Sequence, residues 1–166
     1  MKYIGAVMII MCSFFIGLTL SERLNERLKL LKSFKQLLQQ FKISIDYRIP
    51  SLYDLFSSAS DQMIIGFTQR VASMLNQGIS PEICIKEAIE KDSCGKLLSS
   101  EEKYFIIGIL SEIGSSDIEG QISLLENAIE HIDYYIENAI ENKRKNTKVY
   151  MTSSLYLGLV IAILLI

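Results

Sequence analysis

Residues that could carry out acid–base or nucleophilic chemistry are few in this chain of 166 residues. His131 is its only histidine, so a nucleophile–base relay or a zinc site built from several histidines lacks the residues it needs. Glu130 could orient the ring, but no serine or cysteine is placed in the sequence to pair with it. We therefore predict that the protein is not an enzyme and that His131 is a solvated residue on a helix face.

Metal and phosphate sites are not indicated either. The cysteines are an odd number, and the step from Cys84 to Cys94 matches no common zinc pattern. The acidic residues of the last helix lack the Glu-x-x-His pairs of a di-iron site, and the glycines form no phosphate-binding loop. With a formal net charge of −2 the chain also has no overall basic field for nucleic acid. No cofactor, nucleic acid or small-molecule substrate is expected.

Both ends of the chain are uncharged. Residues 3–20 and 150–166 carry no charged side chain, while all 19 acidic residues and every basic residue except Lys2 lie between them. A helix rises about 1.5 Å per residue, so runs of this length reach across roughly one bilayer core. We expect transmembrane helices in residues 1–20 and 149–166, and a helical domain in residues 21–148.

Other interpretations of the two runs stay open. The first run could be a secretory signal peptide, although it is long for one and no small-x-small cleavage site follows it. Met11 before Cys12 is a poor fit to lipoprotein processing. The second run could be a buried core helix, because its length is near the short limit for spanning a membrane.

Basic residues flank both runs on the side of the domain. They are Arg23 and Arg27 after the first run, and Lys143, Arg144, Lys145 and Lys148 before the second. By the positive-inside rule the domain should face the cytoplasm. The cluster at 143–145 could bind nucleic acid, but beside a membrane it more simply contacts anionic headgroups, at about 1 kcal/mol per charge.

The uncharged runs also carry small residues one helical turn apart. These are Ser13 and Gly17 in the first run, and Ser154, Gly158 and Ala162 in the second. Small faces let transmembrane helices approach closely, so they favour packing between the two ends or with another membrane protein. The alternative is ordinary composition, since such residues are frequent in transmembrane helices.

Apolar residues in the domain recur every three or four positions, which predicts an all-α antiparallel bundle of about six helices. Leu24, Leu28, Leu31, Phe34, Leu38, Phe41 and Ile45 mark one face of a first helix that continues from the first run and ends near Pro50. Further helices are expected at residues 50–57, 61–76, 81–91 and 100–113, the last one capped by Ser100, and from Asp117 onward.

The last helix is the longest, because no proline or glycine interrupts residues 121–157. Its apolar residues form a coiled-coil-like seam: Ile118, Ile122, Leu125, Ile129, Ile132, Ile136 and Ile140, or Ala139 in place of Ile140. We favour packing of this seam against the other helices of the domain over packing against a second chain.

Two kinds of turn stand out. Pro50 and the pair Gly78 and Pro81 each follow a long amphipathic helix and introduce a short one, as in a helix-turn-helix bundle. In the third turn Gly114 can end one helix, and Asp117 can cap the next with Gln121 one turn further on. We interpret this third motif as structural rather than as a contact for a partner.

These residues resemble the stage III sporulation protein AB family of endospore-forming bacteria. The resemblance covers the whole chain and is most specific at residues 113–121, where Gly114, Asp117 and Gln121 fit the family's Leu-Gly-x-x-Asp-x-x-x-Gln pattern with Ile113 for Leu. Local matches also occur at residues 5–6, 20–24, 50–52, 157–159 and 163–166, and at Lys148. Residues 152–154 depart from it, because the family more often has an apolar Leu-Gly pair there.

The resemblance implies a non-enzymatic component of the channel between mother cell and forespore, in the mother-cell membrane. The family is similar to the cytoplasmic helical domain of the platform proteins of type II secretion and type IV pilus systems. It therefore implies a domain in the mother-cell cytoplasm that docks a secretion-type ATPase, stage III sporulation protein AA. The alternative is a structural tether that assembles other channel subunits through its transmembrane helices.

Overall fold

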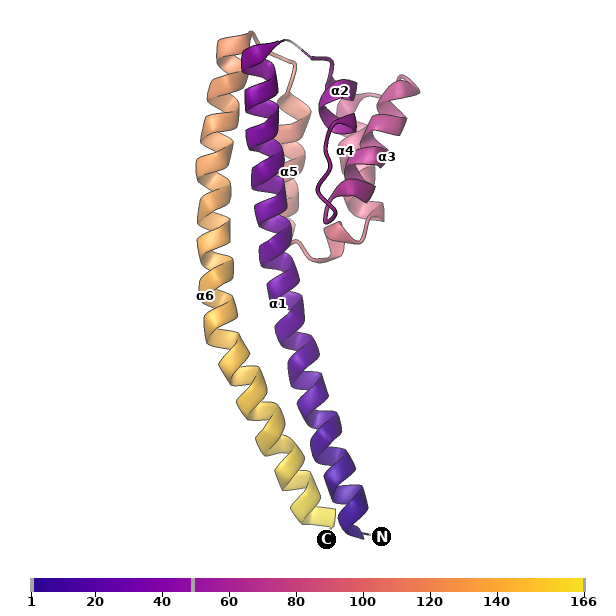
Figure 1. Ribbon diagram of the computed structural model, residues 1–166, viewed down its shortest axis with the longest axis vertical. Coiled ribbons are helices and arrows are strands. Elements are labelled where there is room, and N and C mark those ends of the chain that lie inside the picture. Colours follow the sequence, from indigo (N-terminus) through magenta and orange to yellow (C-terminus); the bar gives the residue numbers. More distant parts are fainter. Residues whose placement is uncertain (1, 49, 166) are drawn as a thin grey trace. The chain divides into compact units, whose positions relative to one another are not determined.

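The computed structural model describes the backbone of residues 2–48 and 50–165. Side chains are described at 21–48 and 50–149, and outside these ranges at residues 11, 12, 15, 19, 152, 153, 156, 160 and 161. The described part of the chain is all-helical and has no strand (Figure 1), which confirms the all-α class, while the flanking transmembrane helices stay a prediction. Its elements are α1 (Lys2–Tyr47), α2 (Leu52–Ser57), α3 (Ile65–Asn76), α4 (Pro81–Lys91), the 3₁₀ turn η1 (Cys94–Lys96), α5 (Ser100–Glu112) and α6 (Ile118–Leu165).

The chain divides into two compact units. The terminal unit comprises Met1–Leu28 and Glu137–Ile166, and the central unit comprises Lys29–Ile136. Helices α1 and α6 are each continuous and contribute to both units. No helix in the described part of the chain is both long and apolar enough to cross a membrane. The predicted domain limits at residues 20 and 148 stay predictions.

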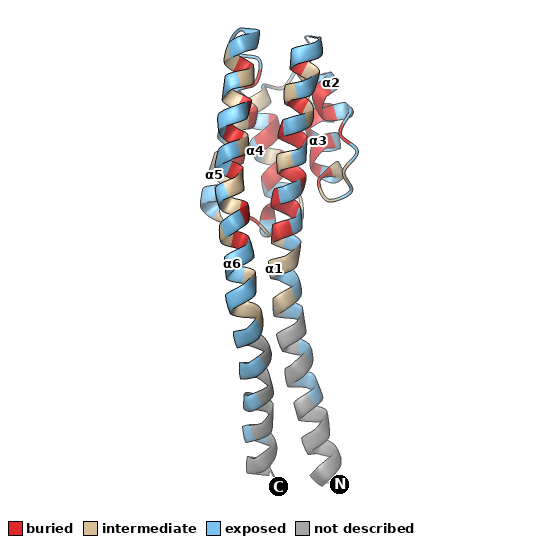
Figure 2. Cartoon of the chain, turned by 60° about the vertical axis from the view of Figure 1, so that its left-hand side comes forward, coloured by how far each residue is buried: buried red, intermediate tan, exposed pale blue. Residues whose placement is uncertain are grey.

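The core of the central unit is centred on phenylalanine side chains from three helices. Phe34 and Phe41 of α1 meet Phe67 of α3 and Phe56 of α2, with ring centroids 5.6 and 5.2 Å apart. All four rings are at most 1% exposed, and these edge-to-face contacts add about 0.5–1.5 kcal/mol each beyond the burial itself. The predicted apolar face of α1 is buried from Leu28 to Ile45 (Figure 2), whereas Leu24 is half-buried.

Helices α1 and α6 are paired within the central unit by two ion pairs. Lys35 lies 2.6 Å from Asp133, and Lys42 lies 2.6 Å from Glu126. The two lysines are one heptad apart on α1, and their two partners are one heptad apart on α6. This matched spacing is the register of an antiparallel coiled coil.

The buried face of α6 differs from the predicted seam at several positions. Leu125, Ile132 and Ile136 are buried as expected, but Ile118 and Ile140 are exposed. Ala128 is buried instead of Ile129, because α6 turns this small side chain toward the core and moves its neighbour to the edge. At the seam position within the terminal unit Ala139 is buried, and it is the stated alternative to Ile140.

The shorter helices pack in chain order, α2 on α3, α3 on α4 and α4 on α5. The path from α4 into η1 requires glycine at residue 95. A Cβ atom there would lie 1.8 Å from the carbonyl oxygen of Ile89, which is fixed backbone. Asp92 supports the same turn, since its Oδ1 accepts a hydrogen bond from Cys94 N at 3.0 Å.

Three predicted helix starts were wrong by a few residues. Helix α2 begins after Ser51 and not at Pro50, and α5 is capped by Ser99 and not by Ser100. In α5 the reason is Glu102, which completes a capping box with Ser99. Helix α3 begins at Ile65 because Asp61 instead accepts a hydrogen bond from Met63 N within a turn.

Candidate functional site

The turn between α5 and α6 contains the predicted Gly114, Asp117 and Gln121 motif. Gly114 has a φ of +90°, in the left-handed region that glycine adopts without strain. Asp117 immediately precedes α6, and its Oδ1 accepts a hydrogen bond from Gly120 N at 3.2 Å. This bond satisfies an amide of the first turn that would otherwise lack a helical partner.

Gln121 ties the two sides of this turn together. Its Oε1 accepts a hydrogen bond from Gly114 N at 3.1 Å, and its Nε2 donates one to the carbonyl oxygen of Ser116 at 2.9 Å. The residue is buried, so both halves of its amide are used inside the turn. This geometry gives the motif a structural role, because it fixes where α6 starts relative to the end of α5.

The proline turns differ from each other in construction. Pro50 precedes Ser51, whose Oγ accepts from Asp54 N at 3.1 Å while the Asp54 carboxylate accepts from Ser51 N. Ser51 Oγ also donates a hydrogen bond to the Asp54 carboxylate at 2.6 Å, and this bond, followed by the one from Ser51 N, holds the pKa of Asp54 below its usual range. Gly78 ends α3 with a φ of +78°, and Pro81 occupies the first turn of α4.

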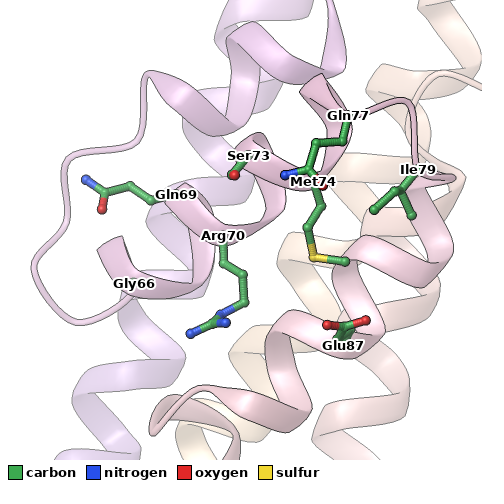
Figure 3. A pocket seen from close by; sticks show the side chains of 8 residues that line it. All are labelled: Gly66, Gln69, Arg70, Ser73, Met74, Gln77, Ile79 and Glu87. Carbon is green, nitrogen blue, oxygen red and sulfur yellow. The ribbon is translucent and has the colours of Figure 1, made fainter.

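A surface groove of about 650 Å³ lies between α3 and α4 (Figure 3). Arg70 of α3 and Glu87 of α4 lie on opposite sides of it, and Glu87 is also paired with Lys91. The remaining lining is mostly uncharged and polar: Gly66, Gln69, Ser73, Met74, Gln77 and Ile79. Sequence reasoning did not indicate this groove, because its residues come from two helices and form no local pattern.

His131 is exposed on α6, as predicted, and its ring also belongs to an aromatic cluster. Its ring stacks on Phe105 of α5, with centroids 4.7 Å apart, and meets the edge of Tyr135 at 5.1 Å. The ring of Tyr134 lies beside the rings of His131 and Tyr135. The signal that sequence reasoning missed is the spacing of 131, 134 and 135, which places three rings on one face of α6.

No group of three or more histidine, cysteine or acidic side chains that could hold a metal ion occurs among the described residues. Cys84 and Cys94 are buried, free thiols. Burial and the neighbouring Asp92 raise the pKa of Cys94 to about 12, so this sulfur is a poor nucleophile.

The six basic residues predicted to flank the uncharged runs all belong to the terminal unit. Arg23, Arg144, Lys145 and Lys148 are exposed, and Arg27 and Lys143 are half-buried. Within the protein, Lys143 donates a hydrogen bond to Asn25 at 2.9 Å, and Lys145 pairs with Glu141. The five small residues predicted to pack in the membrane, Ser13, Gly17, Ser154, Gly158 and Ala162, have side chains outside the described ones.

Two long helices paired one heptad apart, with short helices packed in chain order between them in the sequence, define an all-α protein. A family model for stage III sporulation protein AB matches residues 2–166, and the chain belongs to this family. Membership implies a role in sporulation. The members of the family are structural components of sporulation, and the family is not a known family of enzymes. No curated protein and no solved structure matches the chain.

Proposed function

We propose that this chain is a non-enzymatic membrane component of the channel complex between mother cell and forespore. Its helical domain, in the mother-cell cytoplasm, is the docking platform for the secretion-type ATPase stage III sporulation protein AA. The observation that carries the proposal is the family match over residues 2–166. The channel and the ATPase come from the resemblance of the family to secretion platform proteins.

Membrane attachment is supported by the sequence of the two ends. Residues 3–20 and 150–166 carry no charged side chain, and basic residues flank both runs on the side of the domain. We place the chain in the mother-cell membrane that surrounds the forespore.

The platform role is supported by the construction of the central unit. Ring contacts join α1 to α2 and α3, and join α5 to α6. Each of the two long helices therefore has short helices packed against it. A unit built in this way presents helix faces and turns on which another protein can dock.

A structural tether is the second candidate, and one feature of the terminal unit favours it. There α1 and α6 contact each other through side chains: Ser21 lies 3.2 Å from Thr147, and Lys143 bonds to Asn25. Paired helices at the ends of the chain could hold other channel subunits in the membrane without any docking by the central unit.

One experiment separates the two candidates. Residues 3–20 and 150–166 are replaced by unrelated apolar helices, and both the spore yield and co-purification of the ATPase from solubilised membranes are measured. The platform role predicts that both are retained, whereas the tether predicts that spores are lost and that the ATPase does not co-purify with the altered chain. Failure of the unaltered chain to bring down the ATPase in sporulating cells would contradict the platform.

A further inference from the structure

Four rings of α5 and α6 form one cluster, which we call the aromatic face: Phe105, His131, Tyr134 and Tyr135. Each ring contacts at least two others, with centroid separations of 4.7–6.3 Å. Aromatic pairs at such distances hold one another in fixed orientations. The face is therefore ordered before any partner arrives.

This cluster lies at the surface and not in the core. Tyr134 is 60% exposed and His131 is exposed, while Phe105 and Tyr135 are half-buried. The phenylalanine core around Phe34 and Phe67 is, by contrast, fully buried. Ordered aromatic side chains that stay accessible are the residue types that dominate the energy of protein interfaces.

The charges around the aromatic face are negative. Burial and the nearby carboxylates of Glu101 and Glu102 raise the pKa of Tyr135, which places these acids next to the ring. Apart from Lys103 on α5, the chain has no lysine or arginine from residue 97 to residue 142, and this stretch includes Glu130 next to His131 in the sequence. Of the acids on α6, Glu126 and Asp133 are already paired with lysines of α1.

We propose that the aromatic face of α5 and α6 binds a basic segment of a partner protein, with an arginine or lysine side chain over the rings. A cation above an aromatic ring is attracted by the negative face of the ring, and arginine also stacks on it. Glu101 is exposed, lies near Tyr135 and complements the same charge. This site does not depend on the proposed ATPase docking.

The test uses the full chain with its single histidine labelled with ¹³C, because the ring of His131 then gives one signal from inside the face. The probe is a glycine–serine peptide with spaced arginines. Its control is the same peptide with citrulline, which keeps the shape and removes the charge. We expect the arginine peptide to shift the signal in a saturable way and the citrulline peptide to bind at least tenfold more weakly.

Variants locate the binding. Tyr134→Leu and Glu101→Gln should each weaken arginine-peptide binding about threefold, in keeping with the usual strength of an exposed cation–π contact. Tyr53→Leu is the matched control, since Tyr53 is an exposed tyrosine on α2. Circular dichroism checks that each variant is folded.

Three results would overturn the proposal. Equal binding of the arginine and citrulline peptides would show that charge is not recognised, and unchanged affinity in both face variants would place the site elsewhere. A His131 signal that shifts with protein concentration alone would make a second copy the occupant. Loss of the ATPase in the co-purification above, with peptide binding intact, would remove the platform role and leave this site standing.

Discussion

At the scale of single residues, Gln121 stabilises the α5–α6 turn through two side-chain hydrogen bonds. We expect Gln121→Ala to lower the free energy of unfolding by about 2 kcal/mol, because two hydrogen bonds are lost and Gly114 N is left without its acceptor. Asp117→Ala removes only the cap of α6 and should cost about 1 kcal/mol. Urea unfolding followed by circular dichroism measures both.

Ser123→Ala is the control for these two variants, since Ser123 is exposed on the same helix. It should stay within about 0.5 kcal/mol of the unaltered chain. If Asp117→Ala or Gln121→Ala unfolds like the unaltered chain and yet loses the ATPase, the motif is a contact surface and its structural interpretation is wrong.

Some residue roles could be predicted from the sequence and others could not. The chemistry of the Gly114 turn is local, so residue type and spacing were enough to indicate a left-handed glycine and a cap. The second bond of Gln121, back to Ser116, depends on the path of the loop. The stack of His131 on Phe105 joins two helices and has no local signal at all, since residues far apart in the sequence meet only after folding.

At the scale of elements, the contact of α1 with α6 in the central unit rests on burial and on half-exposed ion pairs. We expect a double-mutant cycle of Lys35→Ala and Asp133→Ala to give a coupling of about 0.5–1 kcal/mol. Both oxygens of Asp133 accept hydrogen bonds from Lys35, and the two side chains are only 28% and 44% exposed. The coupling should fall in 1 M salt, where charges are screened within about 3 Å.

The pair Glu87 and Lys91 is the matched control for this cycle. It lies within α4, one turn apart and more exposed, so its coupling should be about 0.3–0.5 kcal/mol. A Lys35–Asp133 coupling no larger than that of the control at low salt would mean that the ion pair does not contribute to the register of α1 on α6.

The elements themselves followed well from apolar periodicity, because long amphipathic helices repeat their pattern many times. Their ends followed less well, since neighbouring residues compete for the same cap. Ser99 and Ser100 are both able to cap α5, and the choice depends on which of them has a glutamate three residues later. On α6, Ala128 belongs to the buried face, but a seam defined by large apolar residues does not include it.

At the scale of the whole molecule, the two-unit division and the register of α1 on α6 could not be predicted, because both depend on pairings between distant residues. The all-α class could be predicted from the apolar periodicity, and the family from the motif at residues 113–121. The proposed membrane attachment rests on the uncharged ends alone.

Cys12 allows the placement of the first run to be tested with a native residue. It is the one cysteine outside the buried core of the central unit, and its side chain is exposed on α1. If residues 3–20 lie in a bilayer, lipid covers this thiol, and a charged maleimide should label it at least tenfold more slowly in sealed membranes than after detergent is added.

The comparison is made in a chain with Cys84→Ser and Cys94→Ser, and the control adds Ser100→Cys at an exposed position of the central unit. Ser100→Cys should be labelled at the same rate with and without detergent in membranes whose cytoplasmic side faces outward. Equal labelling of Cys12 and Ser100→Cys in those membranes would put the first run in water. Membership of the sporulation family would stand, but the platform would then have to reach the membrane through another protein.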